Sequence, residues 1–296
     1  MSLPNLLIIG AAKSGTTSLY NYLSQHSDLF TSSHKEPHFL INNEIGKTRI
    51  PNGITELKSY MDLFLGKDSF KYRVEASTMY LQFPDISIKN IRKYLDADTK
   101  IIIMLRNPID RAFSGYNHVK RYNLVENLSF ENALELSEDR YHTNVNITPA
   151  SRYKNIGLYY EMVKKFMKEF NENLHIIIYD DFISEPQKEL DKVCSFLSIN
   201  QIQFNVNSKY MVGGWQWKSP FLKKFFLSKG IIKKLFRFLF PFSSLRAFLK
   251  KNIIRNQTSK VPMMKKATRE HLLEYYYNDI VKLSKLLSLD LNKWLK

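Results

Sequence analysis

The chain has 296 residues, a formal net charge of +16 at pH 7, and 20 Phe, 17 Tyr and 3 Trp. This length suffices for one large α/β domain or two small ones, and the aromatic content argues against global disorder. The single cysteine, Cys194, excludes an internal disulfide and a multi-cysteine metal site. We expect it to be a small buried side chain rather than a nucleophile.

No targeting segment is expected. The N-terminal apolar run, residues 6–9, is too short for a signal peptide and has no basic flank. No run approaches the roughly 18 apolar residues of a membrane span. We therefore expect a cytoplasmic protein, peripheral at most on a membrane surface.

A phosphate-binding loop is predicted close to the N-terminus. Residues 6–10 have the composition of a buried strand, and a helix is expected over residues 16–26. Backbone N–H groups at such a junction point at an anion. The loop departs from the Walker A pattern, because Thr16 stands where the lysine belongs and Lys13 lies inside the loop. It is therefore predicted to bind a phosphate without being built for ATP hydrolysis.

The remaining elements alternate between strand and helix. Such alternation predicts one α/β domain over residues 1–296, with a central parallel sheet and helices on both faces. Ligands in such sheets bind beyond the carboxyl ends of the strands. Further strands are expected at residues 71–75, 100–105 and 174–179, and helices at 86–95, 108–122, 158–170, 186–197 and 267–287.

A second anion-binding position follows the strand at 100–105. Arg106 comes directly after it, where a P-loop NTPase would offer an aspartate for Mg²⁺. Arginine grips a phosphate with two parallel hydrogen bonds. Ser114, about two helical turns further on, adds a hydroxyl. We expect two anion subsites and no metal ligand; the alternative for Arg106 is a surface ion pair.

These motifs resemble those of a known family. Residues 10–18 resemble the 5′-phosphosulfate loop of sulfotransferases that use 3′-phosphoadenosine 5′-phosphosulfate (PAPS), and residues 106–114 resemble their 3′-phosphate motif. The resemblance covers most of the chain and implies a P-loop-like sulfotransferase fold. Further segments resemble the heparan-sulfate-type and bacterial members in the family's order: Lys35-Glu36-Pro37-His38-Phe39, residues 75–81, 157–159, 179–186, 196–197 and 290–294.

The resemblance implies roles for the two loops. Lys13 would stabilise the charge that develops on the bridging oxygen as the sulfuryl group leaves. Arg106 and Ser114 would hold the 3′-phosphate, and no metal is required. The donor would also contact the loop and the first helical turn through Lys13, Ser14, Gly15, Thr16, Thr17 and Ser18.

The general base is expected in the segment after the first helix. Glu36 matches the glutamate that serves as base in the glycan members of the group, and His38 is the alternative base. Burial in a cleft can raise the pKa of a carboxylate toward working pH, and we expect this for Glu36. Without the motif, Glu36 would be a solvated carboxylate and His38 a packed histidine. The acceptor is expected to be a hydroxyl, or alternatively an amine, of a carbohydrate or lipid-linked molecule.

The chain also departs from the family pattern, which weakens transfer of a heparan acceptor. Ala76 stands where heparan sulfate 3-O-type members carry a lysine, and Thr78 replaces the usual proline. The K-G-R-type loop that often covers the nucleotide is not recognisable. Lys209, Arg255 and Lys260 are the alternatives for its role.

The excess charge lies in one part of the chain. Residues 192–269 contain 17 Lys and Arg and no Asp or Glu, whereas the rest holds 27 basic and 28 acidic residues. Residues 205–266 within it are basic and aromatic, with helical spacing around 221–227, 231–239 and 245–251. This composition predicts a mostly helical insertion that contacts an anionic membrane surface. The alternative is a cap over the active site; nucleic acid is not the expected partner.

Three functions compete. The leading one is a sulfotransferase that moves a sulfuryl group from PAPS to a glycan or lipid-linked acceptor by in-line transfer. The second is an atypical P-loop nucleotide kinase, disfavoured by the positions of Lys13, Thr16 and Arg106. The third is a non-enzymatic protein that binds polyanions or membranes.

Overall fold

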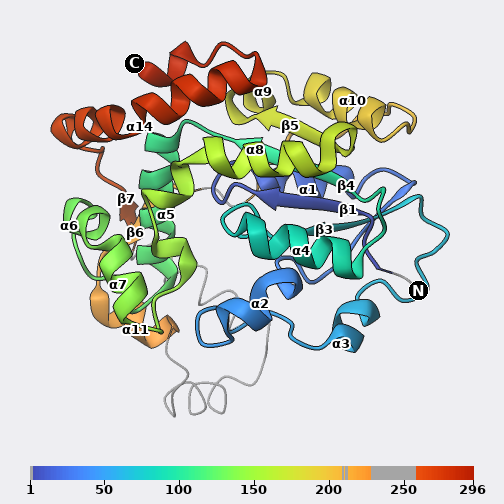
Figure 1. Cartoon of the computed structure of the whole chain (residues 1–296). Helices are drawn as coiled ribbons and strands as arrows, with labels where there is room; N and C mark the ends of the chain where they lie inside the picture. The colour runs from blue at the N-terminus through green and yellow to red at the C-terminus, as the bar shows by residue number, and fades with distance from the viewer. Residues whose placement is uncertain (1–2, 209, 211–212, 228–257) are drawn as a thin grey trace.

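The computed structural model describes residues 3–208, 210, 213–227 and 258–296. Five parallel strands form the central sheet in the order β2-β3-β1-β4-β5 (Figure 1). The strands are β1 (Leu6–Gly10), β2 (Leu29–Thr31), β3 (Tyr72–Ala76), β4 (Lys100–Leu105) and β5 (Leu174–Ile178). The predicted α/β class with a parallel sheet is confirmed.

Both faces of the sheet are buried because its central strands are apolar on both sides. Successive strand residues point to opposite faces. Leu7 and Ile9 of β1 accordingly join one core cluster, and Leu6 and Ile8 join the other. β4 beside it divides in the same way. Each face therefore needs a layer of helices.

The helices divide between these two cores. One layer consists of α1 (Thr16–Leu23), α9 (Tyr179–Ser184) and α10 (Pro186–Phe196). The other is formed mainly by α4 (Pro84–Tyr94), α5 (Pro108–Tyr122), α8 (Tyr159–Phe170) and α14 (Lys266–Leu287). In Figure 1, α4 and α8 lie in front of the strands. This arrangement leaves the carboxyl ends of the strands for the loops.

Shorter elements complete the described structure. They are α2 (Phe39–Ile45), α3 (Leu57–Asp62), α6 (Phe130–Glu135), α7 (Ser137–Thr143), α11 (Pro220–Leu227), η1 (Pro149–Ser151), η2 (Asn155–Gly157), η3 (Asn171–Asn173) and η4 (Asn292–Leu295). Strands β6 (Trp215–Trp217) and β7 (Thr258–Lys260) pair antiparallel and tie the two ends of the basic segment together. α11 coincides with the first predicted helical stretch, whereas those at 231–239 and 245–251 lie outside the described residues.

Several predicted boundaries differ from the observed ones by one to three residues. The first helix ends at Leu23 rather than at residue 26, because Ser24 is its C-cap. Cys194 is fully buried in the core between α10 and the sheet, as expected. Burial raises the pKa of its thiol to about 11. Among the described helices, none combines the length and the apolar character needed to cross a bilayer.

Candidate active site

The loop between β1 and α1 has the geometry of an anion cradle. Gly15 is the N-cap of α1 with a φ of 89°, and it has no side chain to cap the first turn. No acidic residue lies in that turn. The first N–H groups of a helix have no partner within the helix, so those of Thr16 and Thr17 are available to an anion. A Cβ at Gly15 would lie 3.0 Å from the ring of Tyr179, which makes glycine necessary here.

Not every predicted loop residue faces outward. The side chain of Ser14 is fully buried, and its N–H donates to the carbonyl of Ala11 at 3.2 Å. Thr16 is also buried, whereas Thr17 and Ser18 are half-buried. Ser14 therefore shapes the loop, and the outward-facing groups come from the residues that follow it.

Arg106, which follows β4, contacts the loop between β1 and α1, called the donor loop below. Its Nη1 donates to the carbonyl of Lys13 at 3.1 Å, and its guanidinium lies 4.6 Å from the centre of the Tyr179 ring. The hydroxyl of Tyr159 donates to the Arg106 carbonyl at 3.0 Å. The two predicted anion subsites thus share one hydrogen bond, and Tyr179 packs against both. Ser114 is half-buried on α5, the helix that begins just after Arg106.

The side chain of Lys13 is surrounded by other cations. Burial, followed by the charges of Arg121 and Arg106, lowers the pKa of its amine to about 8, and Glu36 partly opposes this shift. Its Nζ lies 3.4 Å from Nδ1 of His118. Burial, Lys13 and Arg121 together lower the pKa of His118 to about 4, so this imidazole is neutral at pH 7. An excess of positive charge beside Lys13 suits a ligand that carries several negative charges.

His118 and Arg121, which lie beside Lys13, were not predicted from the sequence. Both lie on α5, and the positions 114, 118 and 121 follow the i, i+4, i+7 spacing of one helix face. Arg121 is buried, and its Nε donates to the carbonyl of Trp215 at 2.9 Å. Its guanidinium lies 4.3 Å from the centre of the Trp215 ring. Helical spacing counted onward from Ser114 would have identified both residues.

Glu36 and His38 form one hydrogen-bonded pair. Oε2 of Glu36 lies 3.2 Å from Nε2 of His38, and Oε1 accepts from Nζ of Lys35 at 2.9 Å. The Glu36 side chain is 36% exposed, whereas that of His38 is 6% exposed. The structure therefore brings both predicted bases together. It presents the carboxylate to solvent and places the imidazole behind it.

The pKa of Glu36 differs from the sequence-based expectation. Burial acts to raise it, but the hydrogen bond from His38 and the charge of Lys35 outweigh burial and lower the pKa below its usual range. The expectation of a raised pKa did not include these contacts from Lys35 and His38. In this state Glu36 is ionised at pH 7 but weakly basic.

The segment after β3 holds this pair in place. The Ala76 carbonyl accepts from the Glu36 N–H at 3.0 Å, and the Ser77 hydroxyl accepts from the His38 N–H at 3.0 Å. The Thr78 hydroxyl donates to Oε1 of Glu36 at 3.4 Å. This segment is therefore the structural support of the predicted base.

Comparison with known proteins decides the family. The sequence profile of the sulfotransferase domain matches residues 3–212, well over half of the chain. The chain belongs to the sulfotransferase family. This confirms the resemblance drawn from the loop motifs.

Individual sulfotransferases are similar at moderate identity. Human carbohydrate sulfotransferase 15 is 26% identical over 68% of this chain and 44% of its own length. Mouse heparan sulfate glucosamine 3-O-sulfotransferase 5 is 28% identical over 67% of this chain and 54% of its own length. The chain thus spans about half the length of these curated relatives. The crystal structure of a sulfotransferase from Alicyclobacillus acidocaldarius matches all of both chains, with 27% identity and a TM-score of 0.76.

The departures from the sulfotransferase pattern have clear structural outcomes. Ala76 is buried and contributes no cation, while Thr78 adds a hydrogen bond to Glu36 where the usual proline has no donor. Of the residues considered for the covering loop, Lys260 is exposed at the end of β7. Lys209 and Arg255 lie outside the described residues.

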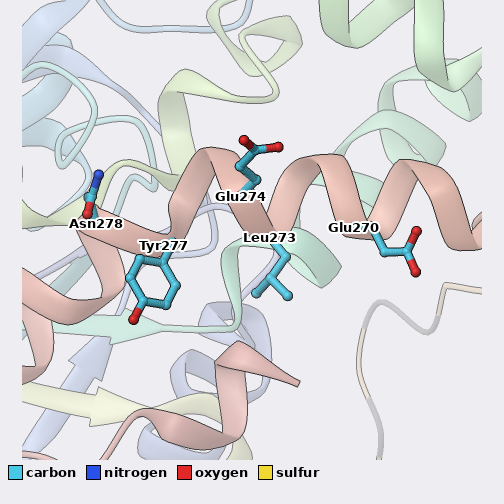
Figure 2. Close-up of a pocket in the computed structure, with 5 residues that line it drawn as sticks. All are labelled: Glu270, Leu273, Glu274, Tyr277 and Asn278. Carbon is cyan, nitrogen blue, oxygen red and sulfur yellow. The ribbon is translucent and has the colours of Figure 1, made fainter.

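No group of three or more His, Cys, Asp or Glu among the described residues could hold a metal ion. A hollow of about 430 Å³ runs along α14 (Figure 2). It contains none of the predicted site residues. Its lining residues all come from this one helix: Glu270, Leu273, Glu274, Tyr277 and Asn278.

Proposed function

We propose that this sulfotransferase moves the sulfuryl group of PAPS to a hydroxyl, or alternatively an amine, of a carbohydrate or lipid-linked acceptor. The observation that carries the proposal is the hydrogen bond from Arg106 to the Lys13 carbonyl. It joins a strand-end arginine to a helix N-terminus, so that two phosphate groups of one nucleotide can be held at once. The lysine inside the loop then lies between the nucleotide and Glu36.

Each residue of the site has a distinct task. Bound PAPS supplies an activated sulfuryl group on a phosphate. The N–H groups of Gly15 to Thr17 hold the 5′-phosphate, and Arg106 with Ser114 holds the 3′-phosphate. The Lys13 ammonium stabilises the charge that develops on the bridging oxygen.

The acceptor hydroxyl loses its proton as it attacks, and Glu36 and His38 are the candidate residues for this step. Glu36 is the group that accepts the proton of the attacking hydroxyl, and His38 orients it through the 3.2 Å contact. His38 has a further buried nitrogen, Nδ1, which has no hydrogen-bond partner among the described residues. Because the carboxylate is the more exposed of the two groups, we assign Glu36 to the proton transfer and His38 to positioning.

The test is transfer of labelled sulfate from PAPS to a panel of glycans, glycolipids and small alcohols. We expect transfer by the wild type and its loss in Lys13→Met and Glu36→Gln. Lys89→Met is the matched control, because Lys89 is exposed on α4. Mg²⁺-dependent ATP turnover without sulfate transfer would instead support the nucleotide-kinase alternative.

We also propose that the basic segment contacts an anionic membrane. In its described part, the side chain of Phe221 on α11 is 75% exposed, and Lys224 is exposed on the same helix. An exposed ring beside lysines suits the boundary between lipid headgroups and acyl chains. Peripheral membrane contact would bring the site close to a lipid-linked acceptor.

A further inference from the structure

A second hollow, of about 480 Å³, lies next to the predicted reaction centre. Its walls come from α1, the end of β2 and the segment that leads to Glu36. They include Tyr20, Asn21, Phe30, Ser33 and Lys35. A hollow of this size is in the range of small-molecule binding sites.

Two hydrogen bonds connect this hollow to the active site. Nδ2 of Asn21 donates to the carbonyl of Thr17 in the first turn of α1 at 2.7 Å. At the other end, Nζ of Lys35 donates to Oε1 of Glu36 at 2.9 Å. A ligand in the hollow would therefore lie beside both the donor loop and the predicted base.

The walls of the hollow are held by contacts of their own. The Tyr20 hydroxyl donates to the Ser32 carbonyl at 2.7 Å, and the Ser32 hydroxyl accepts from the His34 N–H at 3.1 Å. The ring of Phe30 packs against that of Phe70 with 5.6 Å between centres. Walls held in this way lose little freedom when a ligand binds.

The chemistry of the lining suits an acidic sugar. The half-buried ring of Phe30 would pack against an apolar face of a sugar, while hydroxyl and amide groups of the lining would pair with its hydroxyls. Lys35 is the cation of the lining, which contains no Asp or Glu. Nζ of Lys67 lies 5.1 Å from the centre of the Phe30 ring and adds positive charge nearby.

We propose that this hollow binds a sugar unit of the acceptor that carries a carboxylate or sulfate, and that this anion draws Lys35 away from Glu36. The inference rests on the proposed function and names its substrate class. Without Lys35, the carboxylate loses one of the two contacts that depress its pKa and becomes a stronger base. The acceptor O–H bond then breaks toward Glu36 as the new O–S bond forms, and adenosine 3′,5′-bisphosphate leaves with the bridging oxygen.

Binding tests the site without requiring turnover. The probes are cellobiose, its derivative with a carboxylate at C6 of the non-reducing unit, and its 6′-sulfate, titrated calorimetrically into the full chain. We expect the two acidic sugars to bind about tenfold more tightly than cellobiose, as one charge-assisted contact provides. Lys35→Met should remove the preference, so that the two acidic sugars bind no more tightly than cellobiose does, whereas Lys89→Met should behave as wild type.

Three results would overturn the proposal: equal affinity for all three sugars, no binding of any of them, or a preference retained in Lys35→Met. Kinetic measurements with PAPS distinguish a failure of this proposal from a failure of the proposed function. Lys35→Met should raise KM for the acidic acceptors about tenfold and raise kcat for the neutral one above the wild-type value, because it removes a contact that lowers the pKa of Glu36. Lysine-dependent binding of acidic sugars without any PAPS-dependent transfer would refute the proposed function and leave the binding site standing.

Discussion

Replacement of Lys13 by Met is expected to stabilise the fold and to abolish sulfuryl transfer. The pKa of Lys13 falls from 10.5 to about 8, chiefly through burial and then through Arg121. A fall of that size corresponds to about 3 kcal/mol that the folded state spends on holding the ammonium charged. Partial solvent access at the loop reduces this to about 1 to 2 kcal/mol. The uncharged Met side chain fills a similar volume without that cost.

The pH dependence of this gain has a definite sign. Because the folded-state pKa lies below the unfolded one, the unfolded chain binds more protons between about pH 8 and 10.5. Wild-type stability relative to Lys13→Met therefore increases as pH rises through this window. The difference between the two proteins should be full at pH 7 and should shrink toward pH 10.

Denaturant unfolding at pH 7 and at pH 9.5 measures both effects, with transfer of labelled sulfate as the functional readout. Lys89→Met should change neither stability nor transfer, since Lys89 is exposed on α4. A Lys13→Met protein that is less stable than wild type at pH 7, or equally separated from it at both pH values, would refute the electrostatic reasoning. Undiminished transfer would refute the role of Lys13 in catalysis.

Four further predictions follow from single contacts. Arg106→Ala should weaken binding of adenosine 3′,5′-bisphosphate but not of adenosine 5′-phosphosulfate in calorimetry, and equal weakening of both would contradict its 3′-phosphate role. Gly157→Ala should cost about 1 to 3 kcal/mol in denaturant unfolding, because the new Cβ would lie 2.7 Å from the hydroxyl of the buried Tyr276. Asp279 accepts the first N–H groups of α8, and burial raises its pKa to about 6; wild type should therefore lose stability relative to Asp279→Asn as pH rises from about 4 to 6, and a constant difference would contradict this. Phe221→Ser should reduce co-sedimentation with vesicles of anionic lipid, and unchanged binding would argue against α11 as the contact.

The strongest apolar patterns allowed prediction of most of the sheet. β1, β4 from Ile101 onward and the last three residues of β5 are apolar runs, so the sequence identifies them. β2 was missed because it has only three residues, Leu29–Thr31, and its pairing with β3 defines it rather than its composition. α9 was missed because it begins at Tyr179, directly after β5, without a turn residue between them.

Two residues of the candidate site could be predicted because each of them follows a strand in the sequence. Lys13 and Arg106 each follow a strand, and parallel strands bring their carboxyl ends to one edge. The neighbours that set the pKa of Glu36 could not be inferred in the same way. A lysine one residue away and a histidine two residues away have no fixed direction in a loop, and here the backbone around them adopts the uncommon positive φ at Glu36 and His38. The expectation of a raised pKa for Glu36 was therefore wrong because the contacts of this carboxylate depend on the local backbone conformation.

The charges around Lys13 affect both the stability of the fold and the binding of ligands. Lys13 lies among Arg106, Arg121 and Lys35, with Glu36 as the carboxylate that partly offsets them. Such a cluster destabilises the free protein and is stabilised by whatever brings negative charge into it. A nucleotide with two phosphate groups satisfies the donor side, and an acidic sugar at Lys35 would satisfy the acceptor side. Because both ligands are anionic and draw on the same excess of positive charge, each lowers the electrostatic attraction that remains for the other, so donor and acidic acceptor should weaken each other's binding through these charges.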